Sequence, residues 1–184
     1  MFKISVLVDN YAKDPFVPEH GLSVLIESEK ERILFDTGQG NALWGNTEEL
    51  GISLFDLNTL ILSHGHYDHS GNIAEIIARN RDIKFFAHPA CLESRYSQHP
   101  DQMNQIGLED KDKESIKALP QKNLFLSKKP LEISNGLWFS GEIPRKTNYE
   151  VIKTKFYWSK DKRDLDQIPD DISVWIDSKQ GLCI

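Results

Sequence analysis

The sequence predicts an α/β fold, and three observations support this prediction. The composition, 39% apolar and 27% charged over 184 residues, is typical of a soluble globular chain. Short apolar stretches rich in β-branched and aromatic residues recur along it. Between two of them, Ile73, Ile76 and Ile77 follow a helical spacing. Strand, helix and strand in this order imply parallel strands joined by a crossover. We expect a single domain, residues 1–184.

The first third of the chain is dominated by strand patterns. Strands are expected over 4–8, 22–27 and 32–36, the last two joined as a hairpin by a polar turn. A short helix is expected over 41–50 because Gly51 follows as a stop signal. The next strand is predicted at 59–63.

The rest of the chain alternates strands with two polar stretches. Asn72 is placed to cap a helix that precedes a strand at 83–87. Residues 94–121 show weak periodicity, and we interpret them as a long loop with a short helix near 113–119. The polar stretch 149–171 has no predicted element. Further strands are expected at 124–126, 131–133, 137–139, 172–177 and 182–184.

The charge and hydropathy patterns argue against two classes of partner. A net charge of −6 without a basic block disfavours nucleic acid as the main ligand. No apolar run approaches the ~20 residues that span a bilayer, so we expect no membrane association. The N-terminus enters a strand pattern without a signal-peptide h-region, which makes a cytoplasmic location the default expectation.

The run His64-Gly65-His66-Tyr67-Asp68-His69 directly follows the strand predicted at 59–63. It holds three imidazoles and a carboxylate, groups that bind divalent metals through nitrogen or oxygen. In a loop at a strand end, His64 and His66 can face one way while Asp68 and His69 face a neighbouring position. This pattern suits two adjacent metal ions that share one water or hydroxide. The alternative is a solvated turn that is rich in histidine by chance.

This run resembles the HxHxDH motif of the metallo-β-lactamase-fold superfamily. Other stretches are similar to the subgroup that includes the archaeal dihydropterin–ribofuranosylaminobenzene phosphate synthases, namely Asp9-Asn10, Glu19-His20-Gly21-Leu22-Ser23, Leu34-Phe35-Asp36-Thr37-Gly38-Gln39 and Ser140-Gly141-Glu142-Ile143-Pro144-Arg145. The resemblance implies an αβ/βα sandwich, of which this chain would supply the first half plus the start of the second half.

The resemblance also implies a role for each residue of the motif. His64 and His66 would bind a first divalent ion, and Asp68 and His69 a second. Zinc is the first expectation, with manganese or iron as alternatives. Asp68 would also act as the catalytic general base toward the metal-bound water. Asp36 would hydrogen-bond a ligand imidazole and fix its tautomer, or cap the turn that follows it, or do both.

Three further residues are expected to bind substrate, because they belong to motifs that the subgroup shares. These are Glu19, His20 and Arg145. Arg145 could pair with a phosphate or carboxylate, and the alternative is an ordinary surface arginine. The substrate would be a small molecule.

In the resembled subgroup, the strand at 181–184 leads into a histidine loop and a further half that complete the metal site. This sequence ends there, so we expect a C-terminally incomplete domain whose missing ligands are lost with a truncation, supplied in trans or replaced internally. The internal candidates are His20, His88 and Cys91. An uncovered sheet edge would favour a homo-oligomer or a partner that covers it.

These observations lead to one main functional hypothesis with open alternatives. The main hypothesis is a metal-dependent hydrolase or transferase that uses a metal-activated water on an ester or phosphoester-type small molecule, of a phosphorylated or pterin-like kind. The alternatives are a catalytically inactive remnant or binding module, and one component of a split enzyme. Whether the chain is an enzyme on its own is left open by the sequence.

Overall fold

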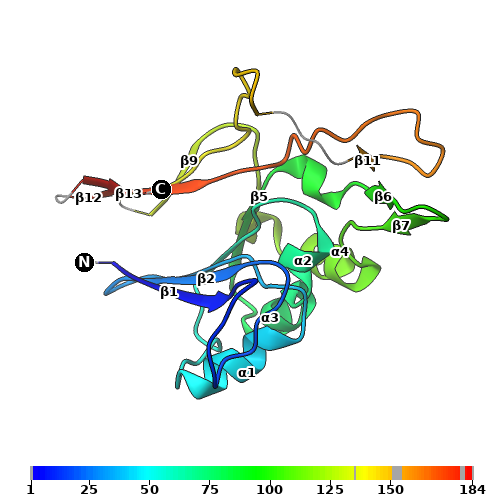
Figure 1. Cartoon of the computed structure of the whole chain (residues 1–184). Coiled ribbons are helices and arrows are strands. Elements are labelled where there is room, and N and C mark those ends of the chain that lie inside the picture. The colour runs from blue at the N-terminus through cyan, green and yellow to red at the C-terminus, as the bar shows by residue number, and fades with distance from the viewer. Residues whose placement is uncertain (1, 135, 151–154, 179–180, 184) are drawn as a thin grey trace.

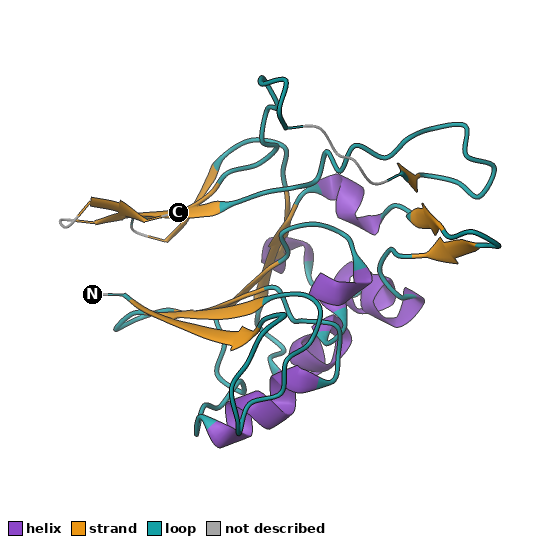
Figure 2. Ribbon diagram, in the orientation of Figure 1, coloured by secondary structure: helices purple, strands orange, loops and turns teal. Residues whose placement is uncertain are grey.

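The computed structural model describes residues 2–134, 136–150, 155–178 and 181–183. In this part of the chain, a large sheet is covered by helices on one face and faces a smaller sheet on the other (Figures 1 and 2). The predicted α/β class is therefore confirmed. No helix in these ranges is long and apolar enough to cross a membrane.

The large sheet has six strands in the order β1-β2-β3-β4-β5-β8. The first three are antiparallel, and β3, β4, β5 and β8 run parallel, as the predicted crossover requires. The strands confirm the sequence predictions to within two residues at each end. They are β1 (Lys3–Val8), β2 (Ser23–Glu27), β3 (Arg32–Phe35), β4 (Thr59–Ile61), β5 (Lys84–Ala87) and β8 (Leu124–Leu126).

The helices are α1 (Ala42–Glu49), α2 (Tyr67–Ser70), α3 (Ile73–Arg79) and α4 (Asp110–Lys117), with 3₁₀ turns η1 (Pro89–Leu92) and η2 (Gln121–Asn123). Asn72 does precede α3, but its side chain makes no capping bond. It donates to the Thr37 carbonyl at 2.7 Å and accepts from Trp44 Nε1 at 3.0 Å. The amide therefore joins α1, α3 and the β3 end instead of capping a helix.

Alternate residues of each central strand enter two different cores, as the period of a β-strand requires. Leu34, Leu60 and Phe85 pack with α1, α3 and α4 in one cluster. Their neighbours Ile33, Ile61 and Phe86 lie in the other cluster, between the two sheets. The sheet is therefore apolar on both faces, which is typical of parallel strands covered on both sides.

The smaller sheet has the order β13-β12-β10-β9. Its strands are β9 (Leu131–Ser134), β10 (Leu137–Phe139), β12 (Val174–Ser178) and β13 (Gly181–Cys183). All four correspond to predicted strands, although Ile184 of the last prediction lies outside the described residues.

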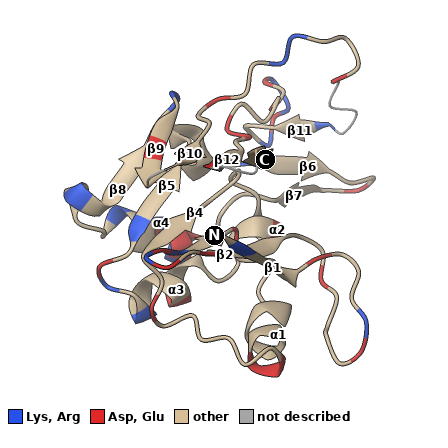
Figure 3. Ribbon diagram, turned by 90° about the vertical axis from the view of Figure 1, so that its left-hand side faces the viewer, with Lys and Arg blue, Asp and Glu red and all other residues tan. Residues whose placement is uncertain are grey.

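Lys and Arg residues are distributed over several elements and interspersed with Asp and Glu (Figure 3).

A third sheet, β11-β6-β7, was not expected from the sequence. It is built from β6 (Tyr96–Gln98), β7 (Met103–Gln105) and β11 (Phe156–Tyr157). The interpretation of 94–121 was therefore wrong in its loop part, which holds β6 and β7, whereas the short helix expected near 113–119 is present as α4, about three residues earlier. The stretch 149–171 contains β11. The strands were missed because Tyr-Ser-Gln and Met-Asn-Gln carry no apolar alternation.

Candidate metal centre

Residues 63–69, here called the histidine loop, follow β4 at the carboxyl edge of the parallel strands. The loop returns to the sheet at its far end, because the Thr37 amide donates to the His69 carbonyl at 2.8 Å. Its last three residues belong to the single turn of α2. The expected run of ligand types is thus displayed at a sheet edge, where parallel α/β sheets present their sites.

Asp36 supports this loop from the end of β3. Its buried carboxylate accepts the Ser63 amide at 2.7 Å through Oδ1 and the Ser63 hydroxyl at 2.6 Å through Oδ2. The same Oδ2 lies 2.6 Å from His69 Nδ1. A proton on Nδ1 that is donated to Asp36 leaves the His69 Nε2 lone pair free to bind a cation.

His64 and His66 form the second part of the cluster. The Nδ1 atom of His64 lies 2.9 Å from the Ser63 hydroxyl, while its Nε2 is 3.1 Å from His66 Nδ1. His66 Nε2 is buried and has no hydrogen-bond partner in the structure. A buried imidazole nitrogen without a partner is costly unless it serves a ligand.

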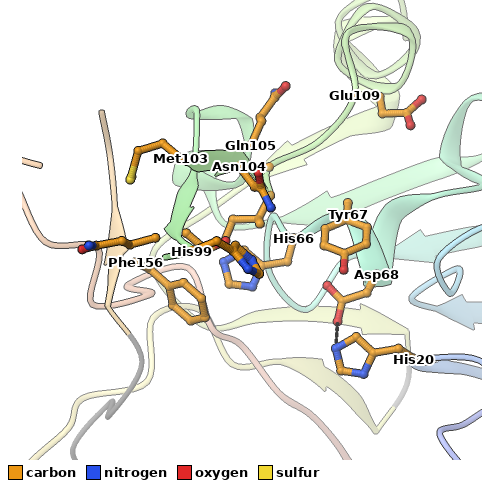
Figure 4. A pocket seen from close by; sticks show the side chains of 14 residues that line it. His20, His66, Tyr67, Asp68, His99, Met103, Asn104, Gln105, Glu109 and Phe156 are labelled. Atoms are coloured by element: carbon orange, nitrogen blue, oxygen red, sulfur yellow. Dashed lines mark ion pairs between the residues drawn. The ribbon is translucent and has the colours of Figure 1, made fainter. Parts of the chain in front are cut away.

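Asp68 lies between two imidazoles at the mouth of the cluster. Its Oδ2 is 3.2 Å from His20 Nε2 and 3.6 Å from His69 Nε2. Figure 4 shows the His20 ring directed at this carboxylate. The second ring nitrogen of His20, Nδ1, lies 3.0 Å from Asn10 Oδ1. The structure therefore brings His20 to the loop through the Asp9-Asn10 and Glu19-His20 stretches.

The three loop imidazoles differ in their proton affinity. Burial and the neighbouring positive groups lower the pKa of His64 and of His66, Arg95 acting on both. Burial opposes protonation of His69, but the hydrogen bond and charge of Asp36 outweigh it and raise the pKa. His64 and His66 are therefore held neutral near pH 7, which is the form that binds metals.

A second support of the loop was missed by the sequence interpretation. The buried Asp170 accepts the Gly65 amide at 2.7 Å and pairs with Arg95 Nη2 at 2.7 Å. Arg95 is itself fully buried and also pairs with Asp166. In the sequence, these residues are an arginine and two aspartates inside polar stretches, at positions where no helix or strand was predicted.

A cleft of about 830 Å³ opens beside the loop. Its walls come from the histidine loop, from the β6–β7 hairpin and from β11, as Figure 4 shows. Among the described residues that line it, side chains with neutral amides, hydroxyls and aromatic rings predominate. These lining residues are His20, His66, Tyr67, Asp68, Ser97, Gln98, His99, Met103, Asn104, Gln105, Ile106, Gly107, Glu109 and Phe156.

Two predicted substrate residues lie outside this cleft. The Glu19 carboxylate accepts four backbone amides at the start of α1, those of Gln39, Gly40, Asn41 and Ala42, at 2.7–3.1 Å. This placement favours an anchoring role at a helix N-terminus. Arg145 contacts the carbonyls of Gln167 and Ile168 and the carboxylate of Asp171. A substrate role for either residue stays a prediction.

Two internal candidates for a missing ligand, His88 and Cys91, make contacts of another kind. His88 is buried; its Nδ1 accepts the Ala90 amide at 3.1 Å, and its Nε2 lies 3.7 Å from Glu142. Cys91 is buried in η1, and that burial raises the pKa of its thiol. A thiol that resists ionisation is a poor metal ligand.

The chemistry of the loop fits a divalent cation, but its geometry fits only in part. The donors are imidazoles and a carboxylate, two of them fixed through Nδ1 by Ser63 and Asp36. Among the described residues, however, no group of three or more His, Cys, Asp or Glu side chains is arranged to hold one ion. The structure places His64 Nε2 3.1 Å from His66 Nδ1, and Asp68 Oδ2 3.6 Å from His69 Nε2; metal binding by either pair stays a prediction.

Comparison with known proteins gives consistent results. The sequence profile of the metallo-β-lactamase superfamily matches residues 17–124. The 7,8-dihydropterin-6-methyl-4-(β-D-ribofuranosyl)-aminobenzene-5′-phosphate synthase of Methanocaldococcus jannaschii is 34% identical over 99% of this chain. An uncharacterized protein of the same archaeon is 33% identical over 92% of it. The chain spans 66% and 64% of the lengths of these two relatives.

Solved structures share the fold. The crystal structure of Tm1679, a metal-dependent hydrolase of the β-lactamase superfamily, superposes with a TM-score of 0.75 at 25% identity. The match covers 99% of this chain and 64% of that one. The crystal structure of the Thermotoga maritima protein tm0894 gives a TM-score of 0.53 at 16% identity, over 98% of this chain and 75% of its own. The observed sheets are thus those of a known hydrolase fold.

Proposed function

Because the chain belongs to the metallo-β-lactamase superfamily, we propose that it acts as a metal-dependent hydrolase or transferase on a small-molecule ester or phosphoester. The observation that carries the proposal is the convergence of the histidine loop's donors at the β4 end. Asp36 and Ser63 hold two of its rings through Nδ1, and His66 Nε2 is buried without a partner. Such oriented imidazoles are what a metal centre requires.

Two divalent ions would be held by the two donor pairs. His64 and His66 would hold the first, and Asp68 and His69 the second, with zinc favoured over manganese or iron. When bound, such ions supply hydroxide from water at neutral pH and stabilise an anionic transition state. A catalytic zinc usually takes three protein ligands, and each pair provides two.

In this proposal, Asp68 is the residue that moves a proton. Its Oδ2 is directed into the cleft and is 3.2 Å from His20 Nε2. A carboxylate at this place accepts a proton from an attacking water. His20 is exposed, and Asn10 holds its Nδ1 side, so the ring connects the carboxylate to solvent. Phe156 packs edge-on against His66, at 5.1 Å between ring centroids, and helps exclude water there.

The cleft supports an uncharged, hydrogen-bonding ring as the part of the substrate it would hold. Gln98, Asn104 and Gln105 offer amide groups, and Phe156 and Tyr67 offer apolar faces. A pterin-like or phosphorylated substrate is our proposal by analogy with the archaeal synthase. Among the described lining residues the amide and aromatic side chains are the groups suited to a ring, so the ring portion of the substrate is the part that this proposal addresses.

The second candidate is a small-molecule binding module without catalysis. It is favoured by one observation: in the described ranges, no three donors surround one position. This candidate would use the same cleft and leave the histidine loop as a structural turn.

Metal content separates the two candidates. We would purify the chain without chelator, measure bound metal by mass spectrometry, and assay an aryl phosphodiester and an aryl ester. The proposal predicts close to two metals per chain and hydrolysis that chelators abolish. His66→Ala should abolish metal uptake, whereas His99→Ala, a histidine in the same cleft but outside the loop, should retain it. A metal-free wild type that stays inactive with added zinc and manganese would favour the binding module.

A further inference from the structure

The structure points to a second layer of control over the histidine loop. We propose that Arg95 and Asp170 are positioning residues, which fix the loop's backbone at Gly65 and join it to the cleft wall that carries Phe156. This inference rests on the proposed function for its purpose. Its geometric basis is independent of any metal, since it concerns the path of the loop itself.

Gly65 is held from two sides. Its amide donates to Asp170 at 2.7 Å. On the other side, a Cβ added at Gly65 would lie 2.3 Å from the Cys91 carbonyl oxygen and 2.8 Å from Cys91 Cα. The loop therefore runs against the backbone of η1 with no space for a side chain. This contact and the Asp170 bond together set the position from which His64 and His66 project.

Arg95 holds Asp170 in place from within the protein. The guanidinium is fully buried and pairs with Asp170 and Asp166, and its Nη2 donates to the Ala90 carbonyl at 2.9 Å. Trp158 covers it, with the guanidinium carbon 4.1 Å from the ring centroid. Residues 90–95 and residues 158–170, two stretches far apart in the sequence, thus meet at one cation.

The same cation reaches the wall of the cleft. Asp166 donates its amide to the Phe156 carbonyl at 2.9 Å, and the Phe156 ring packs against His66. Arg95 also directly precedes β6, which pairs with β11. One buried guanidinium consequently fixes both the floor of the site, at Gly65, and the wall, at Phe156.

Burial of these charges is unnecessary for stability alone. A buried ion pair can usually be replaced by apolar residues without loss, because desolvation offsets its attraction. Here the network also leaves Arg95 Nε and Asp170 Oδ1 without partners, which adds to its cost. The network ends at the Gly65 amide, between the candidate ligands His64 and His66. We therefore attribute its cost to the need to hold these two residues in position.

The test measures the loop directly. We would follow Gly65 amide hydrogen exchange by NMR and zinc affinity by calorimetry in the full chain. The variants are Asp170→Ala, which removes the acceptor, and Asp170→Asn, which keeps an oxygen for the Gly65 amide. The matched control is Asp112→Ala: Asp112 is equally buried and accepts a backbone amide, that of Ala74 at 2.8 Å, but it lies on α4.

Asp170→Ala should speed exchange at Gly65 at least tenfold and weaken zinc binding by about 10- to 100-fold, the usual effect of losing a group that orients a ligand. Asp170→Asn should restore most of the protection, and Asp112→Ala should change neither quantity by more than about threefold. Unchanged Gly65 exchange in Asp170→Ala, or an equal effect in the control, would overturn the positioning role. A wild type that binds no zinc would overturn the proposed function, while the exchange result would still decide this inference.

Discussion

Two buried carboxylates hold the histidine loop, and they do so from opposite ends of the chain. Asp36 lies 27 residues before Ser63 and comes from the strand beside β4. Asp170 lies 105 residues after Gly65 and comes from the segment between β11 and β12. Each accepts a backbone amide of the loop. Only Asp36 also contacts a loop imidazole, and only Asp170 pairs with a guanidinium.

This difference separates two tasks. Asp36 sets the hydrogen-bonding state of a side chain, because its Oδ2 lies against His69 Nδ1. Asp170 contacts the main chain of the loop at the Gly65 amide, and it therefore fixes the backbone position from which the side chains of His64 and His66 extend. A metal centre needs both, since a ligand must have the correct tautomer and also the correct position. Variants that remove one support at a time can test whether the tasks are separable.

The largest effect is expected when the cation beside Asp170 is removed. Arg95→Met leaves Asp166 and Asp170 buried without their guanidinium. Stripping one partner from a buried ion pair costs about 3–5 kcal/mol of the free energy of unfolding. For a chain of this size, the melting temperature should fall by about 10 °C, as measured by calorimetry.

The control for this change is Arg79→Met. Arg79 is partly exposed, pairs with Glu75 and lies over Trp44, so it is a surface cation with similar contacts. Its loss should cost less than about 1 kcal/mol. Comparable losses for the two arginines would show that the buried network contributes nothing beyond ordinary packing.

The next effect concerns the tautomer. Asp36→Asn keeps the shape of the side chain but replaces one carboxylate oxygen with an NH2 group. This NH2 group must face either His69 Nδ1 or the Ser63 amide, so one of the two contacts is lost. His69 is then no longer compelled to carry its proton on Nδ1. Zinc affinity should fall about 10- to 100-fold, and the free energy of unfolding should fall by about 1–3 kcal/mol. Nitrogen-15 NMR of the imidazole would report the tautomer, and an unchanged His69 spectrum would contradict this explanation.

A third change moves the loop without touching either carboxylate. Gly65→Ala puts a Cβ within 2.3 Å of the Cys91 carbonyl, so the loop must shift from η1 and strain its bond to Asp170. We expect a loss of about 1–3 kcal/mol in urea unfolding and weaker zinc binding. Gly45→Ala is the matched control: nothing lies within 4 Å of its added Cβ, inside α1. Gly45→Ala should instead raise the free energy of unfolding by up to about 1 kcal/mol. If both variants change this free energy in the same direction, the proposed crowding at Gly65 is refuted.

The two supports also differ in how far sequence could predict them. Asp36 ends an apolar strand just before a glycine turn, so local pattern placed it at a strand end, and the family resemblance assigned it to a ligand imidazole. Asp170 and Arg95 lie in polar stretches, and their contacts depend on a chain path that no local pattern records. The cleft wall was missed for the same reason, because β6 and β7 are short and polar. Elements with apolar periodicity were predictable, and polar ones buried by long-range contacts were not.

The smallest effect is expected at Asp112, a buried carboxylate that has neither an imidazole nor a guanidinium as a hydrogen-bond partner. Asp112 accepts only the Ala74 amide, its Oδ2 has no partner, and burial raises its pKa above the usual 3.8. The folded state therefore disfavours the ionised form. Its contribution to stability declines as pH rises from about 4 through the raised pKa, because the unfolded chain ionises first.

Asp112→Asn removes this charge and keeps an acceptor for Ala74. The variant should gain stability relative to the wild type as pH rises from 3 to 7, reaching an advantage below about 1 kcal/mol in urea unfolding. Asp110→Asn is the control, since Asp110 is exposed in the first turn of the same α4. Its loss should slightly destabilise the helix through the dipole. If the difference in free energy of unfolding between Asp112→Asn and the wild type does not change with pH, then burial does not raise the pKa of Asp112. The contrast with Asp36 and Asp170, whose carboxylates have charged or imidazole partners, would then fail.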